Sequence, residues 1–213
     1  MSDADGEGIS AVRHGHRAVY DANGAAFDAR RLRVLYERDW LERFLAHVPE
    51  GGRVLDLGCG AGEPIARFLI DRGCELVGLD FSATMLAIAR ERFPGTRFVE
   101  GDMRGLDLAE RFCGIVAWDS FFHLTKDEQR DLIPRLSAHL EPGGAFLATV
   151  GPRESEGIGR VGDGPVYHAS LSPEEYAARF ADVGMTIARF VAEDPDCDRR
   201  SVILARLRSG RRA

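Results

Sequence analysis

The feature that most constrains this chain is a regular alternation of short apolar segments with amphipathic ones between residues 53 and 150. The apolar segments predict five strands, over 53–57, 75–79, 97–100, 113–118 and 145–150. The amphipathic segments predict helices, over 27–48, 63–72, 82–92, 125–140 and 172–184. This alternation is typical of a doubly wound α/β fold, in which helices cover both faces of a mostly parallel sheet. Two last predicted strands, 186–192 and 201–207, form a hairpin and make one strand antiparallel near an edge.

The helix starts carry their own signals. Ser82, Thr125 and Ser172 each stand directly before a predicted helix, where a hydroxyl can accept a hydrogen bond from a free backbone N–H group. Pro64 and Pro173 occupy first-turn positions, where the missing N–H group costs nothing. These signals support the predicted helix boundaries.

The chain of 213 residues is long enough for one sizeable core. We expect a single domain over 27–207 that includes the N-terminal helix, preceded by a flexible lead-in over 1–26 and followed by a basic tail over 208–213. The glycine-rich stretch 151–170 is long for a connection, so we expect it to line or cover a pocket.

Composition narrows the possible partners and location. The net charge of −6 and the absence of a long basic face disfavour nucleic acid, whose phosphates need clustered Lys and Arg. The sequence contains no run of about 18 apolar residues and therefore predicts no membrane span. The four cysteines form no CxxC pair and no zinc spacing, which favours a cytoplasmic protein without a metal site. A monomer or a homodimer is equally compatible with the sequence.

A glycine-rich turn follows the first predicted strand, in the segment VLDLGCGAGEP. Gly58, Gly60 and Gly62 allow a tight turn and a close approach of a ligand to the backbone. Their spacing is GxGxG, whereas dinucleotide binders have GxGxxG. Glu63 would repel a pyrophosphate at the helix N-terminus, and Asp56 adds a second negative charge. The turn therefore suits a cationic ligand without phosphates, such as S-adenosylmethionine.

Three other strand ends carry residues that suit the rest of such a ligand. Asp80 can accept hydrogen bonds from ribose hydroxyls, although it can also cap the helix that follows. Asp102 can accept from an adenine amine and Met103 can pack on the ring, although an Asp at this place is often only a turn residue. The segment Trp118-Asp119-Ser120-Phe121-Phe122-His123 lies where a methyl group and its acceptor should meet.

The segments VLDLGCGAG, LVGLDFS, FVEGDM, VAWDSFFHL and LEPGG, in this order, resemble those of the class I S-adenosylmethionine-dependent methyltransferases. The resemblance covers about residues 50–207 and implies a Rossmann-like, seven-stranded sheet of order 3-2-1-4-5-7-6 with strand 7 antiparallel. It implies S-adenosylmethionine as the cofactor. It also implies cofactor-binding roles for Tyr20, Asp56, Gly58, Cys59, Gly60, Gly62, Asp80, Phe81, Met85, Asp102, Met103 and Asp119.

Methyl transfer needs a base only if the acceptor atom still carries a proton. The first candidates are His123, His168 and Asp119, and Tyr20 and Tyr167 are weaker candidates. A helix-start role for His123 and a loop hydrogen bond for His168 remain open. The residues after the fourth strand do not form an NPPY-like run, which disfavours adenine and glutamine as acceptors. We expect a small organic acceptor, with a protein or nucleic-acid target as an alternative.

Two other functions remain open at the level of sequence. The first is a module that binds S-adenosylmethionine but is catalytically silent, because no single catalytic residue is obligatory for methyl transfer. The second is a nicotinamide-dependent oxidoreductase, which Glu63 and the glycine spacing oppose.

Overall fold

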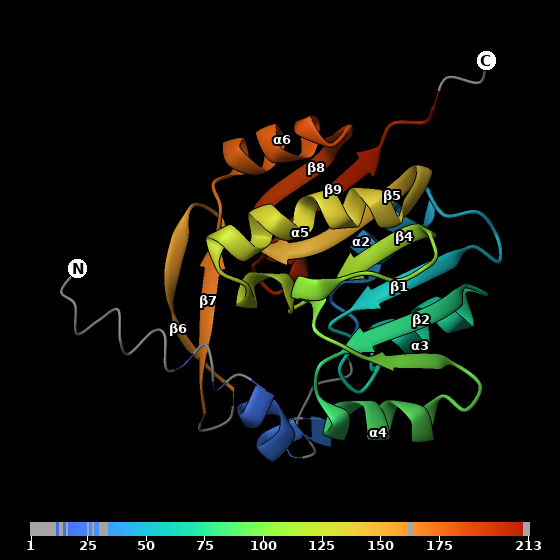
Figure 1. The fold of residues 1–213 in the computed structure, drawn as a ribbon, viewed down its shortest axis with the longest axis vertical. Coiled ribbons are helices and arrows are strands. Elements are labelled where there is room, and N and C mark those ends of the chain that lie inside the picture. The colour runs from blue at the N-terminus through green and yellow to red at the C-terminus, as the bar shows by residue number, and fades with distance from the viewer. Residues whose placement is uncertain are drawn as a thin grey trace.

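The structure is a computed structural model that describes residues 12, 15, 17–24, 26, 28–29, 34–161 and 164–210. Its centre is a seven-stranded sheet of order β3-β2-β1-β4-β5-β9-β8 (Figure 1). The strands are β1 Arg53–Leu57, β2 Glu75–Asp80, β3 Arg97–Glu100, β4 Phe112–Ala117, β5 Leu140–Val150, β8 Met185–Asp194 and β9 Arg200–Leu207. The first five run parallel to one another, and β9 lies antiparallel between β5 and β8. The predicted fold class, strand order and antiparallel strand are confirmed.

Helices cover both faces of this sheet. They are α2 Arg38–Leu45, α3 Ile65–Asp71, α4 Ala83–Arg92, α5 Lys126–His139 and α6 Pro173–Asp182. Three short 3-10 helices accompany them, η1 Met103–Gly105, η2 Phe121–His123 and η3 Pro195–Cys197. Residues from α5 and α6 belong to one buried cluster, and residues from α2, α3 and α4 belong to a second. The sheet therefore separates two apolar layers.

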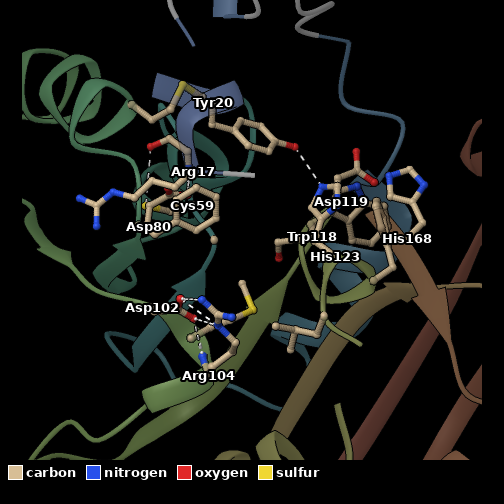
Figure 2. Close-up of a pocket in the computed structure, with 18 of the residues that line it drawn as sticks. Arg17, Tyr20, Cys59, Asp80, Asp102, Arg104, Trp118, Asp119, His123 and His168 are labelled. Atoms are coloured by element: carbon tan, nitrogen blue, oxygen red, sulfur yellow. Dashed lines mark hydrogen bonds and ion pairs between the residues drawn. The ribbon is translucent and has the colours of Figure 1, made fainter. Parts of the chain in front are cut away.

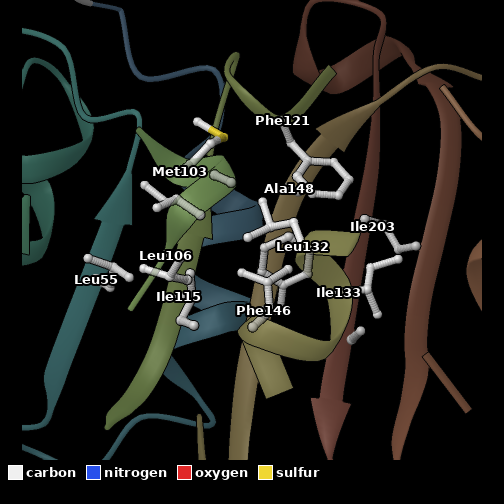
Figure 3. Close-up of a cluster of buried hydrophobic side chains, with 14 of the residues drawn as sticks. Leu55, Met103, Leu106, Ile115, Phe121, Leu132, Ile133, Phe146, Ala148 and Ile203 are labelled. Atoms are coloured by element: carbon white, nitrogen blue, oxygen red, sulfur yellow. The ribbon is translucent and has the colours of Figure 1, made fainter. Parts of the chain in front are cut away.

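The alternation of side chains along each strand produces these two layers. On β4, Ile115 faces the first cluster and Val116 faces the second, and both are fully buried. On β5, Phe146 likewise faces the first cluster and Leu147 faces the second. Figure 3 shows Ile115 and Phe146 packed beneath α5. Strands that are buried on both faces read as continuous apolar runs, which is why the sequence located them well.

The predicted helix caps are present. The Ser82 hydroxyl accepts from the backbone N of Met85 at 3.3 Å, and the Ser172 hydroxyl accepts from that of Glu175 at 3.1 Å. Thr125 forms a reciprocal capping box with Glu128, whose carboxylate accepts from the Thr125 backbone N at 2.8 Å. The starts of α4, α5 and α6 follow from these side chains.

The predicted helix over 27–48 is not continuous. Residues 28–29 are helical, residues 34–37 are not, and helix α2 spans Arg38–Leu45. Leu35 packs against the second buried cluster from outside the helix, so its apolar character reports burial and not helical spacing. Leu32, which contributed to that spacing, lies outside the described residues. Within the expected lead-in over 1–26, residues 17–24 are helical.

The stretch 151–170 differs most from the expected connection. It contains β6 Ser155–Val161 and β7 Gly164–Ser170, which pair antiparallel as a separate two-stranded sheet. Figure 1 shows this hairpin beside the carboxyl ends of the parallel strands. In the described part of the chain, no helix has the length and apolar character needed to cross a membrane.

Candidate functional site

A cavity of about 610 Å³ lies at the carboxyl ends of the parallel strands. Parallel α/β sheets bind ligands at this edge. The walls come from the end of β2, from the segments that follow β1, β3 and β4, and from η1 and η2. Further lining residues come from α4, α5, β9, the hairpin and the helical residues 17–24. Figure 2 shows Asp80 and Asp102 on one side of the cavity, and Asp119, His123 and His168 on the other. Of the predicted site residues, those lining the cavity are Tyr20, Gly58, Cys59, Gly60, Asp80, Phe81, Met85, Asp102, Met103, Asp119, His123 and His168.

The glycine-rich turn is fixed to the second strand. The backbone N–H groups of Gly58 and Cys59 both donate to the Leu79 carbonyl, at 2.7 and 3.1 Å. Gly58 has a φ of +81°, and a Cβ atom there would lie 2.5 Å from the Cβ of Ser120. Only glycine satisfies both conditions without displacement of the neighbouring chain. The turn therefore brings its backbone to the cavity wall.

Asp56 and Gly62 lie behind this turn. They line a separate hollow of about 20 Å³ together with Glu63, and the side chain of Asp56 is buried. The two hollows share Gly58, Cys59 and Trp118 as lining residues. The structure thus does not bring Asp56 or Gly62 into the main cavity, and their predicted contact with a cofactor stays a prediction.

Asp80 joins the turn to the next helix. Its carboxylate accepts from the backbone N of Gly60 and from that of Ser82, both at 2.8 Å. Burial raises the pKa of Asp80, while these two hydrogen bonds act in the opposite direction. Each carboxylate oxygen can accept a further bond, so holding the turn does not preclude contact with ribose hydroxyls. Both interpretations of Asp80 from the sequence are therefore compatible.

Asp102 is paired within the chain. Its carboxylate accepts from the Arg104 backbone N and from the Arg104 Nε, both at 2.9 Å. Burial acts to raise the pKa of Asp102, but the hydrogen bonds and positive charge of Arg104 outweigh it and the pKa is lowered. Arg104 Nη1 also donates to Glu128 at 3.2 Å. The negative group expected for an adenine amine is present, but Arg104 partly neutralises it.

The helical residues 17–24 place Tyr20 over the cavity. The Tyr20 ring meets the Phe81 ring edge to face at a centroid distance of 5.8 Å. The Ser82 hydroxyl donates to the Asp21 carboxylate at 2.6 Å, which ties this helical segment to the start of α4. Tyr20 can therefore cover a ligand bound against Phe81, as the sequence analysis expected.

His123 has a hydrogen bond at each ring nitrogen. Its Nδ1 lies 3.0 Å from the Tyr167 carbonyl oxygen, and its Nε2 lies 2.9 Å from the Tyr20 hydroxyl. The dashed contact between Tyr20 and His123 is visible in Figure 2. The ring thus joins η2 to β7 on one side and to the helical residues 17–24 on the other.

Asp119 is held by an arginine far away in sequence. Arg200 Nε donates to Asp119 Oδ1 and Arg200 Nη2 donates to Asp119 Oδ2, each at 3.0 Å. The Asp119 backbone has a φ of +50° and its N–H group donates to the Thr149 hydroxyl at 2.8 Å. Because both carboxylate oxygens of Asp119 already accept from the Arg200 guanidinium, Asp119 is a weak candidate for a general base.

Sequence reasoning missed five charged residues on the cavity wall, which are Arg17, Arg104, Glu128, Arg160 and Arg200. None of them follows the end of a parallel strand except Arg104, which stands next to the predicted Asp102-Met103 pair. Among the described residues, no group of three His, Cys, Asp or Glu side chains is arranged to hold a metal ion.

The donor set of the cavity fits S-adenosylmethionine better than a dinucleotide. Asp80, Asp102 and Asp119 place carboxylates along it, and the glycine turn provides close backbone contact. Glu63 lines the hollow behind the turn, where it disfavours a pyrophosphate.

Residues 54–144 match the family described as methyltransferase domain. The malonyl-[acyl-carrier protein] O-methyltransferase of Enterobacter lignolyticus is 38% identical over 135 residues, which cover 62% of this chain and 53% of that protein. The trans-aconitate 2-methyltransferase of Variovorax paradoxus is 35% identical, over 56% of this chain and 47% of that protein. The chain therefore spans about half the length of these curated relatives.

Solved structures agree with the sequence match. A methyltransferase from Streptomyces caelestis has a TM-score of 0.71 at 21% identity, and the alignment covers 90% of this chain and 98% of that chain, which shows a shared fold. An amino pentose methyltransferase from Micromonospora echinaspora, solved with bound S-adenosylmethionine, has a TM-score of 0.66 at 25% identity over 88% of this chain and 96% of that chain. By its sequence match over residues 54–144, its strand order and its glycine-rich turn, this chain is similar to the class I S-adenosylmethionine-dependent methyltransferases.

Proposed function

We propose that this protein transfers a methyl group from S-adenosylmethionine to a small organic molecule in the cytoplasm. The observation that carries the proposal is the coupling of Asp80 to the Gly60 backbone N at 2.8 Å, at the edge of a cavity that also contains Asp102 and Met103. These groups match the amino-acid, ribose and adenine parts of one ligand. The relatives support a small acceptor, because they methylate malonyl groups, amino sugars and trans-aconitate according to their names.

In this proposal the two sides of the cavity have different tasks. Gly58, Gly60 and Asp80 hold the methionine and ribose parts, and Asp102 with Met103 holds the adenine. Tyr20 covers the ligand from the N-terminal side. S-adenosylmethionine supplies a methyl group that is activated by the positive charge on its sulfur. The chain then contributes by orienting the acceptor and excluding water.

The acceptor belongs on the side formed by Trp118, Phe122, His123 and His168. This wall is largely aromatic, which suits a compact organic molecule or an amine rather than an extended polyanion. Three of the four arginines on the cavity wall have acidic partners among the described residues. Arg17 pairs with Glu100, Arg104 with Asp102, and Arg200 with Asp119. The paired arginines disfavour a nucleic-acid target. An acceptor carried on a protein stays the alternative, because the malonyl group in the name of one relative is carried on acyl-carrier protein.

The proposal is tested by calorimetric titration of S-adenosylmethionine into the wild type and into Asp80→Asn. Loss of one carboxylate acceptor should weaken binding by about 1–3 kcal/mol, which is about 5- to 150-fold in Kd. Asp127→Asn is the matched control, because the side chain of Asp127 is 88% exposed and lies outside the cavity. Its affinity should equal that of the wild type.

Transfer itself is measured with S-adenosylmethionine labelled at the methyl group, against a panel of small amines, alcohols and carboxylic acids. Appearance of label in any acceptor supports an enzyme. Tight cofactor binding with no transfer to the panel or to a metabolite extract would indicate the catalytically silent module. Binding of NADH in place of S-adenosylmethionine would refute the proposal.

A further inference from the structure

The two histidines at the acceptor side of the cavity, His123 and His168, differ in the hydrogen bonds that their ring nitrogens make. A carbonyl oxygen can only accept, so the bond to the Tyr167 carbonyl requires a proton on Nδ1 of His123. The Nε2 lone pair of His123 then accepts from the Tyr20 hydroxyl. Both nitrogens of His123 are therefore engaged with the protein itself.

His168 lies next to His123 without such bonds. The two ring centroids are 5.0 Å apart, and the Phe122 ring lies 4.7 Å from that of His168. His168 is partly buried and lines the cavity, and within the described part of the chain no hydrogen bond to either of its ring nitrogens is found. Burial lowers the pKa of His168, against the opposing charge of Asp119. Its imidazole is thus neutral at pH 7 and keeps one nitrogen lone pair available.

The hairpin holds the His168 ring in place. A Cβ atom on Gly159 would lie 2.5 Å from the Cε1 of His168, so the glycine on β6 makes room for the ring. The neighbouring Ala169 carbonyl accepts from the buried Gln129 side chain at 2.9 Å, which fixes β7 to α5. A Cβ atom on Gly157, two residues earlier on β6, would meet no other atom within 4 Å. The space at Gly159 is therefore specific to His168.

We propose that His168 accepts the proton of the methyl acceptor, and that His123 is a positioning residue that orients Tyr20. The proposal rests on the function proposed above and narrows the acceptor to a hydroxyl or protonated-amine compound. A carboxylate, which has already lost its proton, needs no such group.

The proposed step balances as follows. The acceptor first loses its proton to the ring nitrogen of His168, which becomes an imidazolium. The acceptor's lone pair then forms the new bond to the methyl carbon, and the electron pair of the broken carbon–sulfur bond stays on sulfur as a neutral thioether. Asp119 faces His168 and stabilises the imidazolium until solvent removes the proton.

Other charged or titratable groups surround this site from every element that packs against it. Asp119 and its partner Arg200 lie at the ends of β4 and β9, His123 lies on η2, Tyr20 lies on the helical residues 17–24, and Arg160 lies on β6. The negative charge nearest to His168 is that of Asp119. Asp119→Asn should therefore lower the pKa of His168 further, because it removes the one charge that raises it.

The test uses the cofactor-free protein and diethyl pyrocarbonate, which transfers an ethoxycarbonyl group to a neutral imidazole nitrogen. Peptide mass spectrometry then gives the modification rate of each histidine. We expect His168 to react at least about fivefold faster than His123, because His123 must first lose a hydrogen bond at Nε2. Tyr20→Phe should raise the rate of His123, and Gly159→Ala should change the rate of His168, whereas Gly157→Ala should leave it unchanged.

Histidine NMR titration on the same samples gives a second readout. A pKa of His168 below 6.5 that falls further in Asp119→Asn supports the proposal. Modification of His123 ahead of His168, or a His168 that is charged at pH 7, would overturn it. Binding of S-adenosylhomocysteine is measured in parallel, so that a failure of the proposed function is recognised separately from a failure of this assignment.

Discussion

Tyr176→Phe removes one buried hydroxyl and leaves the ring in place. That hydroxyl donates to the Gln129 side-chain oxygen at 2.5 Å and accepts from the Leu171 backbone N at 3.3 Å. Tyr176 and Gln129 are both completely buried, so water cannot replace either bond. Burial also raises the pKa of Tyr176 to about 12, which keeps it a neutral donor.

The expected cost follows from the groups left without partners. The substitution deprives the Gln129 oxygen of its donor and the Leu171 N–H group of its acceptor. Each buried group that loses its partner costs about 1–3 kcal/mol, so for two such groups we expect the free energy of unfolding to fall by about 2–6 kcal/mol. The ring contacts remain, because Phe keeps the stacking on Phe180 at a centroid distance of 6.2 Å.

Urea denaturation measures this cost as a lower midpoint at an unchanged slope. Tyr36→Phe is the matched control, because Tyr36 is exposed, and it should change stability by less than about 0.5 kcal/mol. The double variant with Gln129→Leu should cost less than the sum of the two single changes, because it removes both partners of one bond. A loss below about 0.5 kcal/mol for Tyr176→Phe, or strict additivity, would refute the account of this network.

Two further predictions concern the cap of α5 and the dependence of stability on pH. Thr125→Ala should lower the free energy of unfolding by about 0.5–2 kcal/mol in urea denaturation, because the Glu128 N–H group loses its acceptor at 3.1 Å; an unchanged midpoint would contradict the cap. Burial lowers the folded-state pKa of His168 and of His47, so the unfolded chain binds more protons below pH 6.5 and stability falls as the pH drops through that range. His168→Gln should make this fall shallower, and a steeper fall would show that the sign is wrong.

The sheet could be predicted because its strands are buried on both faces. A continuous apolar run such as Ala145 to Ala148 has few other stable positions. The cap residues marked where α4, α5 and α6 begin. The hairpin β6–β7 was not predicted, because glycines and exposed charges interrupt the apolar pattern of its strands. Its strands are stabilised by pairing with each other and by contacts with η2, and a local pattern does not report such contacts.

The candidate site was predictable only along the strand ends. Asp80 and Asp102 stand directly after a strand or at its end, so the topology alone brings them to one edge. The partner of Asp119 is Arg200, which is 81 residues away and belongs to the antiparallel strand. No spacing rule connects these two residues, since the register between β5 and β9 decides which side chain arrives there.

The hairpin has a consequence for how acceptor preference can diversify. It forms its own two-stranded sheet and shares no backbone ladder with the seven strands that carry the glycine turn. Substitutions on β6 or β7 can therefore reshape one wall of the cavity while the strands beneath the adenosyl site keep their hydrogen bonds. For protein engineering, we expect that exchanging residues 151–170 between similar methyltransferases changes the acceptor that is methylated and leaves binding of the methyl donor unchanged.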